Sequence, residues 1–281
     1  MTDRMKQAAQ NSRDRAELAK ERGRERAGVA KRRAAEAREA GIERIDAAKE
    51  AGRERIDATR AAAAGLQAQI KPRLRGVIHG YAFPVSLFAG LLLVLLIGDT
   101  AVERIALGVY ALSLSALLGT SAVYHRVNWK RPGARLWMRR LDHSMIFLLI
   151  AGTITPFAVL VLDGAYSSAV LITVWAAALA GIVVETIWVD APKWVSAVVY
   201  VAVGSLGALA MPAIISKAGI GAGLLIAVGG ILYVIGAVVY ARQRPNPSPA
   251  VFGYHEIFHV LVVAAAAAHF AAVALYAGPG G

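Results

Sequence analysis

The sequence predicts an all-α membrane protein, a seven-helix transmembrane bundle preceded by a charged, partly helical N-terminal arm. Two observations predict this class. The first is that 57% of the 281 residues are hydrophobic although the formal net charge is +12, a combination that is unusual for a soluble domain. The second is that these properties are segregated, since 20 of the 31 Lys and Arg residues precede residue 76. We therefore expect a basic arm over residues 1–70 and a transmembrane domain over residues 71–281.

The transmembrane helices are predicted from length and apolarity. A helix needs about 20 mostly apolar residues to cross a hydrocarbon layer about 30 Å thick. The apolar stretches are continuous instead of alternating, which argues against the strands of a membrane barrel. The fifth and sixth stretches are the least clearly separated, with only Lys217 and Gly219 between them. The seven predicted spans are residues 78–97, 105–124, 144–162, 168–188, 195–215, 219–240 and 255–276.

The orientation is predicted from the basic residues in the connections, because cytoplasmic loops carry an excess of Lys and Arg. The connections that follow the even-numbered spans hold nine such residues, whereas the other side holds Arg104 and Lys217. The arm also ends in basic residues directly before the first span. We expect a multi-pass protein of the cell membrane, plasma or inner, with a cytoplasmic N-terminus and an external C-terminus.

The arm contains an 11-residue repeat, residues 39–49 followed directly by residues 50–60. Eleven residues complete three helical turns and keep one narrow stripe aligned, here Ile42, Ile45 and Ile56 with Ala48. Three interpretations stay open: a solvated charged helix, a surface helix held by anionic lipid headgroups, and self-association through the stripe. Nucleic-acid binding is not expected, because aromatic residues are not interleaved with the charges.

The candidate chemistry lies in polar residues at the predicted helix ends. The chain has no cysteine, which excludes a disulfide scaffold, a thiolate metal site and a cysteine nucleophile. Ionisable residues within membrane spans are costly and are functional candidates by default. His125 ends span two, Asp142 and His143 open span three, and His255 and His259 open span seven. The predicted topology places all of them on the cytoplasmic side, at one depth.

These residue types suit a zinc ion, Zn2+. His255 and His259 are four residues apart and therefore share one helix face, and His125 supplies a third imidazole. Three histidines with a water in the fourth position form the open arrangement of a catalytic zinc site. Ser121 lies one turn before His125 and can orient an imidazole or a substrate. Asp142 is expected to act beyond the metal ligands, as an acceptor or a base.

Four ordered motifs resemble those of the hemolysin III family, which belongs with the progestin and adipoQ receptors, including the adiponectin receptors. They are Ser121–His125, Leu141–Ile146 followed by Gly152–Pro156, and His255–His259, with Lys71–Gly76 ahead of the first span. The resemblance covers about residues 71–276 and leaves the arm unexplained.

That resemblance implies a seven-helix bundle with a zinc ion on the cytoplasmic side. The implied ligands are His125, His255 and His259, with Asp142 near the metal-bound water. It also implies relatives that hydrolyse lipid amides, and a family label of cytolysis.

A rival interpretation starts from His255-Glu256-Ile-Phe-His259, which also matches the H-E-x-x-H pattern of metalloproteases. The third ligand would be the aspartate of Leu162-Asp163-Gly164. The predicted topology places Asp163 at the far side of the membrane, about 30 Å from the histidines, so we reject this interpretation. Glu256 is then expected to face lipid headgroups or basic loop residues such as Arg135, and His79 in the first span is expected to be structural.

Three functions remain open at the level of sequence. The first is a zinc-dependent hydrolase that acts on a lipid-like amide or ester, with membrane lipids as partners. The second is a non-catalytic sensor or membrane-homeostasis protein with a structural zinc. Pore formation ranks last, because no span carries a continuous polar stripe.

Overall fold

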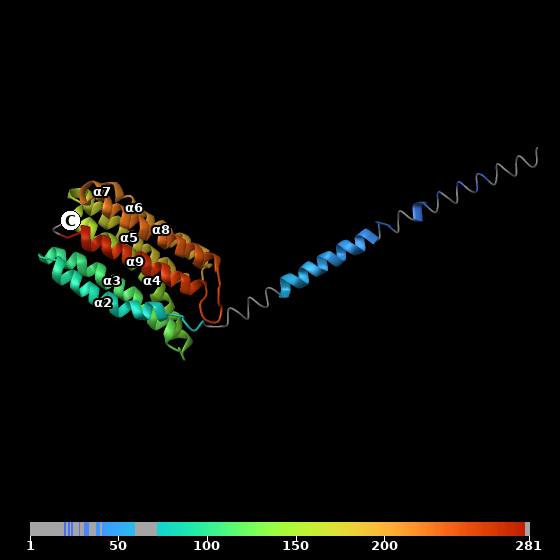
Figure 1. Cartoon of the computed structure of the whole chain (residues 1–281), viewed down its shortest axis with the longest axis horizontal. Coiled ribbons are helices and arrows are strands. Elements are labelled where there is room, and N and C mark those ends of the chain that lie inside the picture. Colours follow the sequence, from blue (N-terminus) through green and yellow to red (C-terminus); the bar gives the residue numbers. More distant parts are fainter. Residues whose placement is uncertain are drawn as a thin grey trace, which may run out of the picture. The chain divides into compact units, whose positions relative to one another are not determined.

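The computed structural model describes residues 72–278 and 41–59, together with residues 20, 22, 24, 28, 31–33, 38 and 39. The chain divides into two compact units, Met1–Gln69 and Ile70–Gly281. The first unit is helical over residues 41–59, and the three isoleucines of its predicted stripe are exposed there. The second unit is a bundle of helices (Figure 1).

The described part of the chain is helical and contains no strand, which confirms the all-α class; six helices are long and apolar enough to cross a membrane. A bent pair of shorter helices makes a seventh crossing if it is counted as one span. The helices are α2 (Val77–Ile97), α3 (Ala101–Arg126), α4 (Pro132–Pro156) with the π-helix η1 (Phe157–Val161), α5 (Gly164–Ile187), α6 (Lys193–Ala208), α7 (Met211–Ala218), α8 (Ile220–Arg242) and α9 (Tyr254–Tyr276).

The fifth predicted span is the bent pair, α6 followed by α7 at an angle of 42°. Pro212 lies in the first turn of α7, where its missing N–H is tolerated. Within a continuous helix its ring would clash with the carbonyl of Ala208, the last residue of α6. The proline therefore explains why α6 ends where it does.

The third span starts earlier than its apolar stretch suggests. Helix α4 begins at Pro132, in the favoured first-turn position, and runs ten residues before reaching Asp142. The expectation that Asp142 and His143 open this helix is therefore wrong, because the amphipathic stretch before them is helical as well. Both side chains project from the middle of a helix, which holds them more firmly than a loop would.

The first and last spans lie side by side, so that α2 packs on both α3 and α9, and α8 packs on α9 (Figure 1). Close approach of helices depends on small residues. Gly152 of α4 is an example, since a Cβ placed there would come 2.1 Å from Ser113 Oγ of α3. The packing of α2 on α9 makes the first and last spans neighbours despite their separation in sequence.

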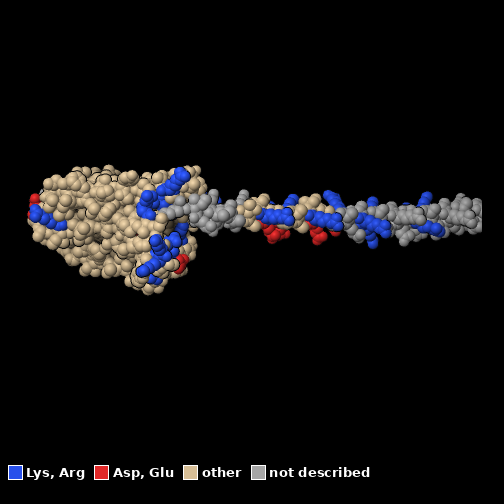
Figure 2. All heavy atoms as spheres, turned by 90° about the horizontal axis from the view of Figure 1, so that it is seen from below, with Lys and Arg blue, Asp and Glu red and all other residues tan. Residues whose placement is uncertain are grey.

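Basic side chains gather at one end of the bundle, here called the basic end (Figure 2). It is the end at which α2 and α9 begin and α3 stops. The opposite end carries Arg104 and Lys217. The basic residues at the basic end are Arg73, Arg75, Arg126, Lys130, Arg131, Arg135, Arg139, Arg140, Lys193, Arg242 and Arg244.

Candidate metal centre

Three histidines meet at the basic end, between the end of α3 and the start of α9. One ring nitrogen each from His125, His255 and His259 lies within 4.8 Å of the other two. The Nε2 atoms of His125 and His255 are 3.1 Å apart. Two ligands of a tetrahedral zinc, each about 2.0–2.1 Å from the metal, are separated by about 3.3 Å. The spacing of this pair therefore fits two ligands of one zinc ion, and the third nitrogen is close enough to join them around a metal ion.

Burial supports the same assignment. His259 is 2% exposed, and within the described residues its Nδ1 has no hydrogen-bond partner. Leaving a buried polar atom unsatisfied costs about 1–3 kcal/mol, and the Nδ1 of His259 is such an atom on a ring whose nitrogen converges with those of His125 and His255. Neutral imidazole nitrogens are ligands that zinc prefers, and the donor set therefore fits the metal.

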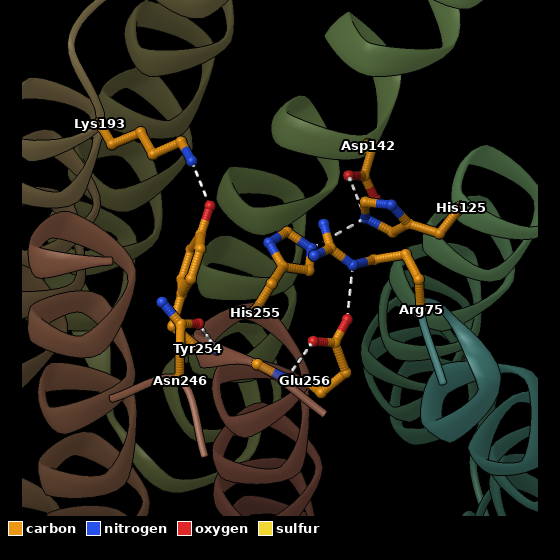
Figure 3. A network of polar contacts seen from close by, with 9 residues as sticks. Arg75, His125, Asp142, Lys193, Asn246, Tyr254, His255 and Glu256 are labelled. Atoms are coloured by element: carbon orange, nitrogen blue, oxygen red, sulfur yellow. Dashed lines mark hydrogen bonds and ion pairs between the residues drawn. The ribbon is translucent and has the colours of Figure 1, made fainter. Parts of the chain in front are cut away.

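The two predicted catalytic residues lie beside this cluster. Asp142 Oδ2 is 3.6 Å from His125 Nε2, which places a carboxylate next to the cluster (Figure 3). The Ser121 hydroxyl, on α3 one turn before His125, is within hydrogen-bonding reach of the Asp142 carboxylate. Ser121 is 3% exposed. The structure thus brings together the three predicted ligands and the two predicted catalytic residues, from α3, α4 and α9, whereas His143 does not join the cluster.

A fourth imidazole, His79, which the sequence predicts to be structural, contacts the cluster. The ring of His79, in the first turn of α2, is stacked on His259 with centroids 3.8 Å apart and planes 9° from parallel. His79 is 2% exposed and is outside the group of three whose nitrogens converge. The sequence signal that could have predicted this contact is the position of His79 as the third residue of α2, at the depth of His125.

Glu256 does not face the lipid surface; of the two expected alternatives it takes the basic partner, but that partner is Arg75 instead of Arg135. Its side chain is fully buried, and Arg75 Nε donates to its Oε1 at 2.5 Å (Figure 3). Its Oε2 accepts the Gly253 N–H at 2.8 Å, capping α9. A buried carboxylate requires partners of this kind. Glu256 therefore ties the segment before α2 to α9, the helix that carries two of the histidines.

That segment, Arg73–Gly76, is held tightly against the basic end. The N–H groups of Arg73 and Leu74 donate to the carbonyls of Ala250 and Val251, in the connection between α8 and α9. Gly76 has φ +75°, and a Cβ there would lie 2.6 Å from the Cβ of His125. Glycine is required on both counts. The backbone of this segment therefore forms one wall of the histidine cluster.

A second buried pair lies next to Asp142 along α4. His143 Nδ1 is 2.5 Å from Glu185 Oε1 of α5, and Glu185 is 3% exposed. A buried carboxylate needs a polar partner, and His143 provides one for Glu185. The pair joins α4 to α5 immediately after the candidate base.

The metalloprotease arrangement is absent from the described residues. Asp163 lies at the end of the bundle opposite the histidines, directly before α5, and its side chain pairs with Lys217. Twenty-one residues of mostly helical chain separate it from Asp142, which corresponds to about 30 Å. This confirms the rejection of Asp163 as a third ligand.

Comparison with known proteins agrees with the motifs. The family described as "Haemolysin-III related" matches residues 67–270. The chain is 31% identical over 203 residues to the "Hemolysin-3 homolog" of Bacillus subtilis (strain 168), covering 71% of this chain and 91% of that protein. It is 32% identical over 206 residues to "Hemolysin-3" of Bacillus cereus, covering 72% and 90%.

More distant relatives have other names. The human "Monocyte to macrophage differentiation factor" is 27% identical over 183 residues, which cover 64% of this chain and 74% of that protein. The "Adiponectin receptor protein" of Drosophila melanogaster is 28% identical over 190 residues, 60% of this chain and 41% of that protein. On its sequence, its bundle of membrane-spanning helices and its ordered motifs, the chain belongs to the haemolysin-III related family.

Proposed function

We propose that this protein is a zinc-dependent membrane hydrolase that cleaves a lipid-like amide or ester. The observation that carries the proposal is the convergence of three histidine nitrogens with a carboxylate 3.6 Å from one of them. Catalytic zinc sites have three protein ligands and keep one position for water or substrate, whereas structural sites have four. The grouping of Asp142 and Ser121 beside the histidines supports a catalytic site.

The residues have distinct roles in this proposal. His125, His255 and His259 hold the metal, which when bound supplies a Lewis acid and lowers the pKa of water to about 7. Asp142 accepts a proton from the attacking water at Oδ2 and returns it to the leaving amine or alcohol. Ser121 holds the Asp142 carboxylate in position. His79, stacked on His259, limits the rotation of that ring.

The level of the site within the bundle supports a lipid substrate. His125 is the penultimate residue of α3, and His255 is the second residue of α9. Helix ends lie near the boundary between the hydrocarbon and the headgroups, which is the level of the carbonyl groups of membrane lipids. A lipid amide or ester therefore reaches the site without leaving the membrane.

The basic end is proposed to face the cytoplasm. Basic residues near span ends set orientation, and they are concentrated at this end of the bundle (Figure 2). The N-terminus is then cytoplasmic and the C-terminus external, in the cell membrane. The basic arm, on the same side, is proposed to contact anionic lipid headgroups.

The proposal is tested by combining metal content with turnover. We expect purified full-length protein to retain about one zinc ion per chain and to hydrolyse a long-chain fluorogenic amide or ester. His255→Ala should lose both properties. Asp142→Asn should keep the zinc and lose turnover by about 100- to 10,000-fold. Zinc-loaded protein that cleaves neither an amide nor an ester would sink the hydrolase proposal.

A structural zinc is the second candidate, favoured by the number of elements that meet at the cluster. The histidines join α3 to α9, and His79 adds α2. In that case removing the zinc with a chelator should lower the unfolding midpoint strongly, and Asp142→Asn should have no phenotype. A small change in midpoint with complete loss of turnover favours the catalytic role.

A further inference from the structure

Two cations flank the histidine cluster, and the structure neutralises only one of them. Arg75 and Lys193 both lie close enough to His255 to interact with it electrostatically. The Arg75 guanidinium is paired with Glu256 at 2.5 Å. Within the described part of the chain, Lys193 forms no ion pair. Its ammonium donates instead to the Tyr254 hydroxyl (Figure 3).

The ammonium of Lys193 is held in a defined place. Its Nζ lies 4.8 Å from the ring centroid of Tyr254 and 5.5 Å from that of Tyr240. Both tyrosine rings in turn adjoin His255, at centroid distances of 6.1 Å and 6.0 Å. Asn246 accepts the N–H of Tyr254 and fixes that residue at the start of α9. The Lys193 ammonium is therefore anchored on Tyr254, whose ring adjoins His255.

The nearby carboxylates are already engaged. Glu185 is 2.5 Å from His143, Glu256 is paired with Arg75, and Asp142 is directed at His125. A divalent metal in the histidine cluster would add two positive charges beside Lys193. Like charges in a low-dielectric region repel strongly, so the loaded site favours a second anion, beside Lys193, in addition to Asp142.

The backbone around Lys193 adds to the positive potential. Lys193 is the first residue of α6, a helix of 16 residues whose N-terminus has no side-chain cap. Helix N-termini carry a partial positive charge and favour anions. The N-terminus of α9 differs, because Glu256 already occupies it by accepting the Gly253 N–H.

We infer that Lys193, with Tyr254, binds the anionic oxygen group of a lipid beside the metal centre. The ligand is a lipid that carries a phosphate or a carboxylate in its headgroup. Lysine binds phosphate as a point charge, and the position of the site at the helix ends favours a membrane lipid over a soluble anion. This inference deepens the proposed function by naming the class of substrate, and it rests on that function only for the reaction that follows binding.

The test measures binding instead of turnover. Zinc-loaded full-length protein in a neutral detergent is titrated with lysophosphatidic acid, with the uncharged lipid monoolein of the same chain length, and with inorganic phosphate. We expect lysophosphatidic acid to bind at least tenfold more tightly than either of the others. Equal binding of monoolein would show that the charge is not recognised. Equal binding of inorganic phosphate would show that the anion is not a lipid.

Variants separate Lys193 from general surface charge. Lys193→Met should weaken binding of lysophosphatidic acid about tenfold or more, the effect of losing a charge-assisted contact, and Lys193→Arg should restore most of it. Lys130→Met is the matched control, an exposed lysine at the same end of the bundle, and should have no effect. Equal losses in the two methionine variants would overturn the assignment.

Two measurements keep this inference distinct from the proposed function. Tyr254→Phe keeps the ring but removes the hydroxyl that holds the ammonium, so it should weaken binding less than Lys193→Met. It also tests the site if Lys193→Met does not fold. Protein that binds lysophosphatidic acid through Lys193 but hydrolyses nothing would disprove only the hydrolase. Protein that hydrolyses neutral lipids with unchanged rates in Lys193→Met would disprove only the anion site.

Discussion

Side chains at the metal centre differ in how far their roles follow from sequence. Spacing alone places His255 and His259 on one helix face, and the structure brings His125 to them within 4.8 Å. His79 is expected from sequence to be structural, and its contact with the cluster could not be predicted because a single histidine in an apolar span has no partner within its own segment. Its stacking on His259 depends on the packing of α2 against α9, which no local pattern specifies.

The stacking of His79 makes a prediction about metal affinity. His79→Ala removes the ring that restrains His259, so zinc affinity should fall about tenfold or more, measured by competition with a chromophoric chelator. His79→Phe keeps a flat ring and should retain most of the affinity. His269→Ala is the control, because His269 forms a hydrogen bond with the Ile226 carbonyl elsewhere in the bundle. Equal losses in His79→Ala and His79→Phe would contradict a role for stacking.

At the scale of elements, hydrophobicity predicted the position of every span but not how the helices begin and bend. The amphipathic stretch from Pro132 extends α4 beyond its apolar part, and Pro212 divides the fifth span into α6 and α7. The contact between the segment Arg73–Gly76 and α9 could not be predicted, because the sequence does not show which basic residue pairs with which carboxylate. Arg75 lies among many basic residues, and only the fold selects it for Glu256.

The Arg75–Glu256 pair predicts that losing one partner destabilises the bundle more than losing both charges. Arg75→Met leaves Glu256 buried without its charged partner and should destabilise the bundle by about 3–5 kcal/mol. The double variant Arg75→Met/Glu256→Gln removes both charges and should be more stable than Arg75→Met alone. The comparison is made from unfolding midpoints in one detergent. A double variant that is less stable than Arg75→Met would argue against a coupled pair.

Gly76 offers a second test of the same element. Gly76→Ala forces a Cβ into a left-handed backbone and against His125, which should destabilise the bundle by about 2 kcal/mol or more. The zinc content should fall with it, because the displaced residue is one of the three proposed ligands. Gly133→Ala, where a Cβ meets nothing within 4 Å, should leave both the midpoint and the zinc content unchanged.

For the whole molecule, the separation of charge from hydrophobicity predicts independent units, and the chain divides at Gln69 and Ile70. Removing residues 1–70 should therefore leave a monodisperse bundle with the zinc content of the full chain, measured by size-exclusion chromatography and elemental analysis. Binding to vesicles that contain anionic lipid should weaken. Aggregation of the truncated chain in every detergent that suits the full-length protein would show that the arm is needed for folding.

The pairing of the first and last spans has a consequence for biosynthesis. The ligands from α3 and α9 are separated by most of the transmembrane domain, and the wall formed by Arg73–Gly76 closes only against the connection that precedes α9. A ribosome delivers α9 to the membrane last. A nascent chain that stops short of α9 carries only one of the three proposed ligands, so we expect metal uptake only after α9 is inserted. On the proposed zinc site, the metal content of newly made protein is therefore expected to report complete insertion.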